Sequence, residues 1–252
     1  MRIVSLQPSV SIILDQLGKL DLLAGCTRYC LDAVPVLRSR QIAVVRDSWS
    51  TTVNELTALR PDLVIASVPY RQESLTAILK AGCPVLALAP HSLADIYQDI
   101  RLIGAVAGAQ DQANRIVAAM DAEIGATTAR FRGLGSAPVV YCEEWGKPLI
   151  HSQSWVRELV EAAGGTFLGE PGKITTADAV AACDPDIIVM AWCGAGDRVP
   201  VNRVVAMRGW QQMRAVRSQR IACVPDEWLN TPAPSLLKGL RAMVQILHPG
   251  KC

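Results

Sequence analysis

Residues 55–67 read ELTALRPDLVIAS, a helical run that breaks at Pro61 and then continues as an almost wholly apolar stretch. Such a stretch is typical of a strand that is covered on both faces of its sheet. The same order of helix, Pro-Asp and apolar run returns at residues 178–191, DAVAACDPDIIVMA. This alternation predicts parallel sheets with helices on both faces, and its recurrence predicts two similar α/β lobes.

Outward from these two stretches, short apolar runs continue to alternate with helical patterns. We expect strands at residues 2–6, 22–25, 61–67, 84–90, 138–144, 185–192 and 220–225, and helices at 8–18, 53–59, 74–81 and 154–165.

From Ser92 to about Arg130 the pattern stays helical for nearly forty residues, with interruptions at Gly108 and Asp111. This is long for a crossover within one sheet and suits a rigid helical connector. It also leaves no room for the eight strand–helix units of a barrel. The expected organisation is therefore an N-terminal α/β lobe (1–92), a connecting helix (93–132) and a C-terminal α/β lobe (133–252).

The composition of the 252-residue chain excludes several classes of protein. Half of the residues are hydrophobic and 19% are charged, which is unlike a disordered chain. The 25 Lys and Arg residues against 23 Asp and Glu residues give a net charge of +2, without the basic footprint of a nucleic-acid binder. No run approaches the roughly 18 consecutive apolar residues of a membrane span.

The cysteines and the first residues bear on the cellular compartment. Of the eight cysteines, Cys83, Cys142 and Cys223 lie in apolar runs, where a free thiol packs as a small hydrophobic residue. The start MRIVSLQPSV enters a strand at once and lacks the basic and apolar regions of a secretory leader. These features predict a cytoplasmic protein, or a periplasmic one if a leader has been removed.

Motifs of catalysis are missing from the sequence, which has no GxGxxG opening a helix after a strand, no GxxxxGK[ST], no GxSxG and no HExxH. Adjacent carboxylates occur at Glu143-Glu144 and Asp226-Glu227. We interpret both pairs as solvated strand ends, because neighbours on a strand point to opposite faces. We expect no enzymatic activity, no catalytic residue and no separate metal ion.

The aromatic residues point to a ligand surface. Six of them lie at the ends of predicted strands or in the loops beside them: Tyr29, Trp49, Tyr70, Trp145, Trp192 and Trp228. The carboxyl ends of the strands of an open parallel sheet line the ligand crevice. Bulky, half-polar rings gathered there predict a wide apolar surface for a large, flat or greasy ligand, although each ring alone could simply cover a core. Trp155 and Trp210 are expected to be packing residues.

An ordered set of motifs runs through the chain, from RIVSLQPSVSIILDQLG and AGCTRYC through EEWGKPLIHSQSWVRELVEAAGG and AWCGAG to NTPAPSLLKGLRAMVQILHP. Together, over about residues 2–249, they resemble the cobalamin-binding branch of the class III periplasmic substrate-binding proteins of ABC transporters, the cobalamin and iron-siderophore type. The resemblance implies two Rossmann-like parallel-sheet lobes joined by a long rigid helix. It also implies that a corrinoid is held in the cleft between the lobes.

The resemblance implies roles for individual residues as well. Tyr29, Trp49, Trp145 and Trp228 match cleft aromatics of the family, and the stretch around Trp192-Cys193 matches a cleft loop. The implied function is the binding of cobalamin or a related corrinoid, as a carrier, salvage or uptake component.

His151 follows PLI at an expected cleft-facing strand end. Because a neutral imidazole is a good ligand for cobalt, we hypothesise that His151 is an axial ligand of the corrinoid. The alternative is a hydrogen-bonded loop histidine.

Transport members of the family carry one glutamate per lobe that docks onto arginines of the membrane permease. Gln72-Glu73 leaves a carboxylate near the first of these positions, whereas Asn230 stands where the second glutamate is expected. A permease is therefore a doubtful partner.

Two other functions remain open. One is the binding of an iron siderophore or haem, for which Arg28, Arg46 and Arg71 are candidates in loops, because arginine clusters recognise anionic groups. The other is an enzyme subunit on the same scaffold, with Cys26, Cys30, Cys142 or Cys193 holding a cofactor. The fold alone does not separate these functions.

Overall fold

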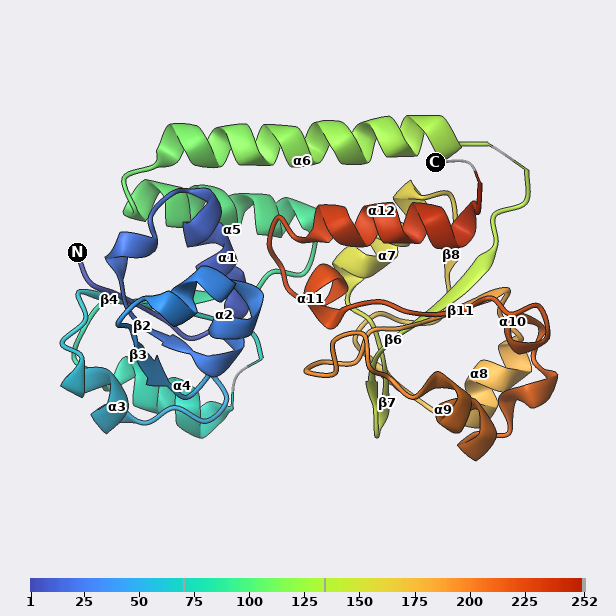
Figure 1. Cartoon of the computed structure of the whole chain (residues 1–252), viewed down its shortest axis with the longest axis horizontal. Helices are drawn as coiled ribbons and strands as arrows, with labels where there is room; N and C mark the ends of the chain where they lie inside the picture. The colour runs from blue at the N-terminus through green and yellow to red at the C-terminus, as the bar shows by residue number, and fades with distance from the viewer. Residues whose placement is uncertain (70, 134, 251–252) are drawn as a thin grey trace. The chain divides into compact units, whose positions relative to one another are not determined.

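The computed structural model describes residues 1–69, 71–133 and 135–250. The chain folds into two compact units, the first formed by Met1–Pro90 and Ala94–Ala118, the second by residues 91–93 and those from Ala119 onward. Each unit contains one sheet with helices on both of its faces (Figure 1), which confirms the predicted fold class. The division of the chain at residues 92 and 132 stays a prediction.

Five parallel strands form the sheet of the first unit: β1 (Ile3–Ser5), β2 (Leu23–Thr27), β3 (Ala43–Val45), β4 (Leu63–Ser67) and β5 (Val85–Leu88). Their order is β3-β2-β1-β4-β5. Val4 in β1 and Val64 and Ile65 in β4 have no exposed surface. The unbroken apolar run of β4 suits this place, because both faces of an inner strand are covered by other elements.

The helices of the first unit follow its strands: α1 (Pro8–Gln16), α2 (Arg28–Ala33), α3 (Val53–Ala58) and α4 (Gln72–Leu79), with 3₁₀ turns at Leu20–Leu22 and Pro35–Ser39. Leu56 of α3 and Ile78 of α4 pack with Val64 and Ala66 on one face of the sheet. Helix α1 contacts β1 and β4 from the other face (Figure 1). Pro8 lies in the first turn of α1, where its missing N–H costs no helical hydrogen bond.

The long helical stretch consists of two helices, α5 (Leu93–Val106) and α6 (Gln110–Phe131). Between them Gly108 has a φ of +65°, a left-handed conformation that glycine adopts without a steric penalty. The predicted interruption at Gly108 is therefore confirmed. Helix α6 belongs to the first unit up to Ala118 and to the second from Ala119.

The sheet of the second unit is mixed. Its strands are β6 (Val139–Gly146), β7 (Leu149–His151), β8 (Thr166–Phe167), β9 (Ile174–Thr175), β10 (Ile187–Met190) and β11 (Ile221–Cys223). Their order is β11-β10-β6-β7-β9, with β8 also beside β6. Strands β8 and β10 run parallel to β6, and β11 runs parallel to β10, whereas β7 is antiparallel to both β6 and β9. Strands β8 and β9, with two residues each, carry no readable hydrophobic period and were not predicted from the sequence, whereas β7 agrees with the strand end expected at His151.

The helices of the second unit are α7 (Ser154–Ala162), α8 (Ala177–Cys183), α9 (Val201–Met207), α10 (Arg214–Arg217), α11 (Asp226–Leu229) and α12 (Leu236–Leu247), with a 3₁₀ turn at Trp210–Gln212. Helices α8, α9 and α10 enclose a core around Trp210, while α7 and α12 lie on the other side of the sheet (Figure 1). Trp210 is 0% and Trp155 4% exposed, which confirms their packing roles.

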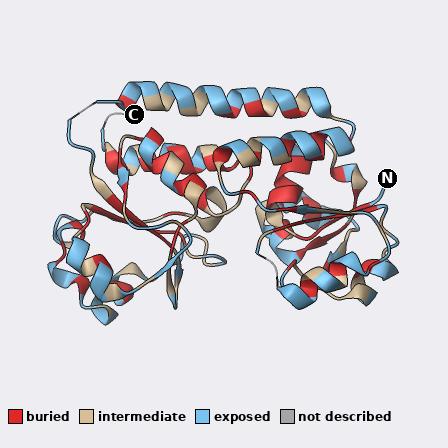
Figure 2. Cartoon of the chain, turned by 180° about the vertical axis from the view of Figure 1, so that it is seen from behind, coloured by how far each residue is buried: buried red, intermediate tan, exposed pale blue. Residues whose placement is uncertain are grey.

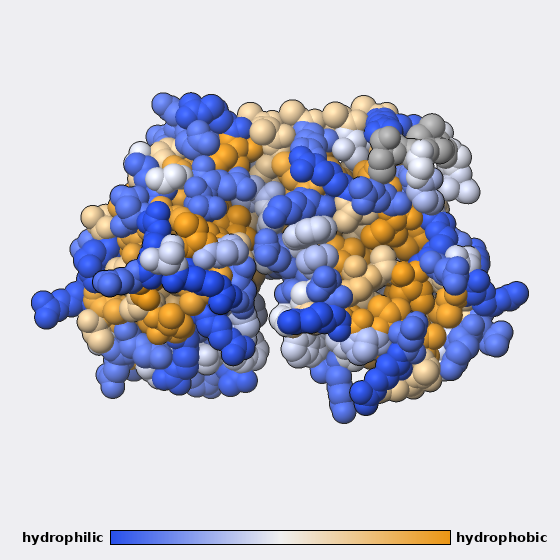
Figure 3. All heavy atoms as spheres, viewed as in Figure 1, coloured by the Kyte–Doolittle hydropathy of each residue, from blue (hydrophilic) through white to orange (hydrophobic). Residues whose placement is uncertain are grey.

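Burial follows this layering, because the strands and the inward faces of the helices hold the buried residues in each unit (Figure 2). On the face seen in Figure 3, hydrophobic and hydrophilic residues are interspersed on both units, so hydropathy alone does not locate a binding site there. Within the described residues, none of the helices combines the length and the apolar character that crossing a bilayer requires.

Candidate functional site

The aromatic residues predicted for the first lobe lie at the carboxyl ends of the strands of the first unit. Tyr29 follows β2 in the first turn of α2, and Trp49 lies in the loop after β3. They are 40% and 41% exposed, so both rings are available to a ligand. Tyr70, the third of these residues, lies outside the residues that the structure describes.

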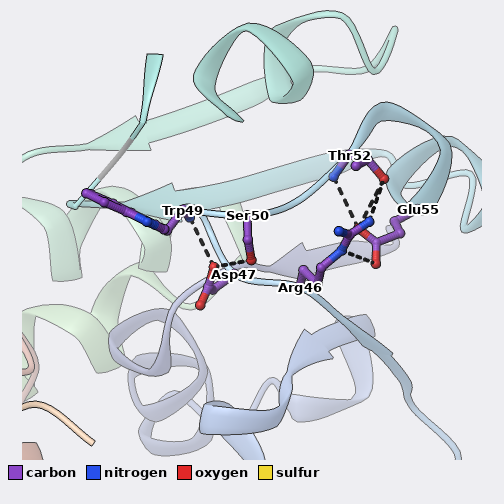
Figure 4. A network of polar contacts seen from close by, with 6 residues as sticks. All are labelled: Arg46, Asp47, Trp49, Ser50, Thr52 and Glu55. Atoms are coloured by element: carbon purple, nitrogen blue, oxygen red, sulfur yellow. Dashed lines mark hydrogen bonds and ion pairs between the residues drawn. The ribbon is translucent and has the colours of Figure 1, made fainter. Parts of the chain in front are cut away.

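The loop that carries Trp49 is held by hydrogen bonds within itself (Figure 4) and by one from α4. The carboxylate of Asp47 accepts bonds from the backbone N–H of Trp49 (3.2 Å) and from the hydroxyl of Ser50 (2.8 Å). The hydroxyl of Ser74, in α4, donates to the carbonyl oxygen of Trp49 (2.5 Å). The backbone of Trp49 is thus fixed while its ring remains exposed.

A second polar group on the same loop begins helix α3. Glu55 accepts bonds from the Nε of Arg46 (3.0 Å) and from the backbone N–H of Thr52 (3.1 Å), which forms a capping box with the Thr52 side chain (Figure 4). Burial works against ionisation of Glu55, but the bonds from Arg46 and Thr52 outweigh it and hold the pKa of Glu55 below its ordinary value. Arg46 is therefore engaged by a carboxylate of α3, the helix that follows its loop.

Tyr29 and Trp49, the exposed rings among the described residues of the first unit, each lie against an arginine side chain. The guanidinium carbon of Arg71 lies 4.6 Å from the centre of the Trp49 ring, and that of Arg28 lies 5.0 Å from the centre of the Tyr29 ring. These are cation–π distances. The carboxyl edge of the first sheet therefore presents aromatic faces and positive charge together.

The three tryptophans predicted for the second lobe also lie at the carboxyl ends of their strands. Trp145 is the penultimate residue of β6 and is 43% exposed, and its Nε1 donates to the carbonyl oxygen of Lys147 (2.9 Å). Trp192 follows β10, and Trp228 lies in α11 after β11. Both are half-buried. The sequence pattern thus located these three side chains at one edge of the second sheet.

A buried carboxylate holds Trp192 in place. Glu143 has no exposed surface and accepts bonds from the Nε1 of Trp192 (2.6 Å), from the hydroxyl of Tyr141 (2.7 Å) and from both terminal nitrogens of Arg208 (2.7 and 2.9 Å). The Trp192 ring also packs on Gly146, where an added Cβ would lie 2.3 Å from the ring. Burial and the adjacent Glu143 charge raise the pKa of Tyr141, which keeps its hydroxyl a donor.

The interpretation of Glu143-Glu144 as a solvated strand end is wrong. Glu143 points into the core because β6 runs on to Gly146, so that this residue lies within the strand and not at its end. Arg208, 65 positions further along the chain, neutralises it. The sequence shows no local sign of this pair, since only the packing of α9 against the sheet brings the two charges together.

The loop after Trp192 is anchored to α11. The Asp226 carboxylate accepts the backbone N–H groups of Gly194 (2.8 Å) and Gly196 (2.9 Å). Cys193 lies between them and Trp192 and is exposed. Glu144 accepts a bond from Gln153 (2.7 Å), and burial raises the pKa of Glu144 to about 7. Trp192 and Cys193, predicted as a cleft loop, thus lie on an ordered segment with carboxylates around it.

Asn230, which stands at the second docking position, is engaged within the second unit. Its side-chain nitrogen lies 2.5 Å from the carbonyl oxygen of Ala191 and 3.5 Å from the Sγ of Cys193. Glu73, near the first docking position, lies in the first turn of α4 and is exposed. The role of either residue in docking stays a prediction.

His151 is packed among other side chains. It is 6% exposed, its ring meets that of Tyr141 edge-on at 5.3 Å, and a Cβ on Gly169 would lie 2.3 Å from it. Burial lowers the pKa of His151, so the ring is neutral near pH 7. Axial ligation by His151 stays a prediction and would require the ring to leave this packing.

Among the described residues, no group of three or more His, Cys, Asp or Glu side chains is placed to hold a metal ion.

Known proteins resemble the whole length of this chain. A cobalamin-binding protein of Halobacterium salinarum is 23% identical over 98% of this chain and 69% of its own length. An uncharacterized ABC transporter substrate-binding lipoprotein of Bacillus subtilis, YvrC, is 25% identical over 98% of this chain and 80% of its own. The fold is similar to that of a periplasmic haem-binding protein from Pseudomonas aeruginosa, with a TM-score of 0.86, 22% identity and coverage of 99% and 93% of the two chains.

These similarities contradict the predicted cytoplasmic location. The Bacillus subtilis relative is named a lipoprotein and the Pseudomonas aeruginosa protein is named periplasmic, and a family model described as periplasmic binding protein also matches this chain. The cysteines led to the wrong compartment because Cys26, Cys30 and Cys142 are core residues with no exposed surface. A cysteine that fills a core position as a small hydrophobic residue says little about the compartment.

The match to a family model agrees with the arrangement described above. Two units, each with a sheet whose carboxyl edge carries exposed or half-buried aromatic rings, are found between residues 1 and 250. The family model described as periplasmic binding protein matches residues 3–227, which covers most of both units. The chain therefore belongs to the periplasmic binding protein family.

Proposed function

We propose that this protein binds cobalamin or a related corrinoid and delivers it to an ABC permease. The observation that carries the proposal is the set of four tryptophans at the carboxyl edges of the two sheets, Trp49, Trp145, Trp192 and Trp228. The family consists of substrate-binding proteins, and the Halobacterium salinarum relative named as cobalamin-binding aligns with 98% of this chain.

The chemistry of the two edges suits a corrinoid. An indole ring buries about 150–250 Å² of surface against an apolar partner, and a corrin ring offers a face large enough for several such contacts. The periphery of cobalamin carries carboxamides, which can donate hydrogen bonds. Glu144, Asp226 and Glu227 supply acceptor oxygens beside the tryptophans of the second unit.

Haem is the second candidate, because the fold matches that of a periplasmic haem-binding protein and because Arg28 and Arg71 lie beside exposed rings. The carboxylates of the second unit favour the corrinoid, because they can accept hydrogen bonds from its peripheral carboxamides, which haem does not carry.

Titration of the purified protein with cyanocobalamin, hemin and a ferric siderophore tests the proposal. Cyanocobalamin alone is expected to quench tryptophan emission at low concentration, and Trp49→Ala and Trp228→Ala should each weaken binding about tenfold or more, which is the usual loss for an aromatic anchor. Met207→Ala, at a side chain that is 75% exposed on α9, is the matched control and should bind normally. Tight binding of hemin without cyanocobalamin would refute the corrinoid assignment.

A further inference from the structure

We propose that Arg28 and Arg71, each stacked on an exposed ring at the carboxyl edge of the first sheet, form an anion subsite that takes the phosphodiester of a corrinoid's nucleotide loop. The inference rests on the proposed function and adds to it the part of the ligand that the first unit recognises.

The two arginines have the same kind of environment, because each lies over an exposed aromatic ring. Arg71 lies 4.6 Å above Trp49 and Arg28 lies 5.0 Å above Tyr29. The four residues are exposed, and they follow β2, β3 and β4 at one edge of the sheet. A guanidinium stacked on a ring keeps its N–H edge free, and this edge matches two oxygens of a phosphate group.

Their charges are available, unlike those of neighbouring arginines. Arg38 pairs with Asp32, and Arg46 pairs with Glu55. Within the described part of the chain, neither Arg28 nor Arg71 forms an ion pair with a carboxylate. The polar contact of Arg28 is to the neutral hydroxyl of Tyr29 (3.5 Å).

The surroundings of Arg71 keep its partner ring in place. Asp47 accepts a bond from the backbone N–H of Trp49 (Figure 4), and Ser74 donates one to its carbonyl oxygen. The carboxylate of Asp47 is directed at its own turn, where it accepts the bonds of Trp49 and Ser50. Glu73 follows Arg71 in the first turn of α4 and is the exposed acidic side chain nearest to it in the sequence.

The edge of the first sheet offers an anionic group two guanidinium groups that make no ion pair within the described residues, those of Arg28 and Arg71. At the edge of the second sheet, Lys238 lies 6.0 Å from the centre of the Trp228 ring, but Glu144, Asp226 and Glu227 lie at the same edge. Because opposite charges attract, we assign the phosphodiester to the first unit.

Two corrinoids that differ in the nucleotide loop test the anion subsite. Cyanocobalamin contains the phosphodiester, and dicyanocobinamide lacks the nucleotide loop that carries it. The wild-type protein should bind cyanocobalamin about tenfold more tightly, as expected for two charge-assisted contacts at an exposed site, and added salt should reduce this preference. In Arg28→Gln/Arg71→Gln the ratio of the two affinities should fall to about one, because the affinity for cyanocobalamin falls more than that for dicyanocobinamide. Arg38→Gln, which removes the same charge from an arginine that is already paired, is the control.

The outcomes separate this inference from the proposed function. Binding of both corrinoids with equal affinity, or an equal loss for both in the double variant, would overturn the anion subsite and leave corrinoid binding intact. Failure of the wild-type protein to bind either corrinoid would overturn the proposed function itself. Binding of hemin that depends on Arg28 and Arg71 would assign the subsite to a carboxylate ligand and would overturn the phosphodiester assignment.

Discussion

At the scale of single residues, Glu143 is a charged side chain that the fold buries completely. It is a fully buried carboxylate with a nearly buried cationic partner, since the side chain of Arg208 is 10% exposed. Such a pair contributes little compared with an apolar pair of the same shape, but the loss of one partner leaves the other charge unpaired in a medium of low dielectric. The stability of the second unit therefore depends on the pair as a whole.

We predict that Glu143→Gln lowers the free energy of unfolding by about 3 kcal/mol, because Arg208 is left buried without a counter-charge. Urea denaturation followed by circular dichroism measures the change. Glu55→Gln, which breaks the exposed pair with Arg46, should cost at most about 1 kcal/mol. Equal losses for the two variants would show that the burial of Glu143 does not matter.

Glu144 predicts a dependence of stability on pH. Burial raises its pKa to about 7 in the folded protein, above its ordinary value of 4.5. The folded protein therefore binds the proton more tightly than the unfolded chain does, and the contribution of Glu144 to stability falls as the pH rises from about 4.5 to about 7. In Glu144→Gln this decline should be smaller, which thermal unfolding at pH 5, 6, 7 and 8 measures. An unchanged pH profile would mean that Glu144 titrates normally.

At the scale of elements, Gly108 ends α5 and allows α6 to begin. Its φ of +65° is a conformation that a residue with a Cβ adopts only with strain, and no atom lies within 4 Å of where a Cβ would be. A substitution at Gly108 is therefore expected to strain the backbone without causing a steric clash.

Gly108→Ala is expected to destabilise the protein by about 1 kcal/mol. Gly125, inside α6, is the matched control, because it too has open space around a Cβ but no left-handed φ. Gly125→Ala should stabilise the protein by up to about 1 kcal/mol, since alanine is the better helix former. Thermal unfolding of the two variants should therefore shift in opposite directions, and a shift in the same direction would contradict the role of φ.

At the scale of the whole molecule, ligand binding and stability are linked. A corrinoid that binds only the folded chain stabilises it by about 2.7 kcal/mol at a concentration one hundred times its dissociation constant. Cyanocobalamin should accordingly raise the unfolding temperature in calorimetry, and hemin at the same concentration should not. A rise with hemin alone would favour the second candidate ligand.

The sequence predicted the strands and helices where apolar runs were long enough to show a hydrophobic pattern. LVIAS of β4 and IIVM of β10 are uninterrupted, and both lie fully buried inside their sheets. Strand β1, IVS, is equally short but was predicted, because a helix signal at Pro8 follows it directly; strand β3, AVV, was not predicted, because a loop follows it and α3 begins only at Val53.

The same limit applies to the candidate site. The tryptophans at strand ends were found because their position in the sequence relative to a strand determines their edge of the sheet. The partner of Glu143 was not found, because Glu143 lies in β6 whereas Arg208 follows α9, and only tertiary packing brings the two together. The packing of His151 against Tyr141 and Gly169 was hidden for the same reason.

The fixed position of Trp192 has a consequence for conformational entropy. Its indole is bonded to Glu143 at 2.6 Å and lies against Gly146, so its rotamer is selected when the chain folds. A side chain that is free before binding loses about 0.5–1.5 kcal/mol of rotamer freedom when a ligand immobilises it. Trp192 has already lost that freedom in the folded protein, and a ligand that covers its ring keeps the full contact energy.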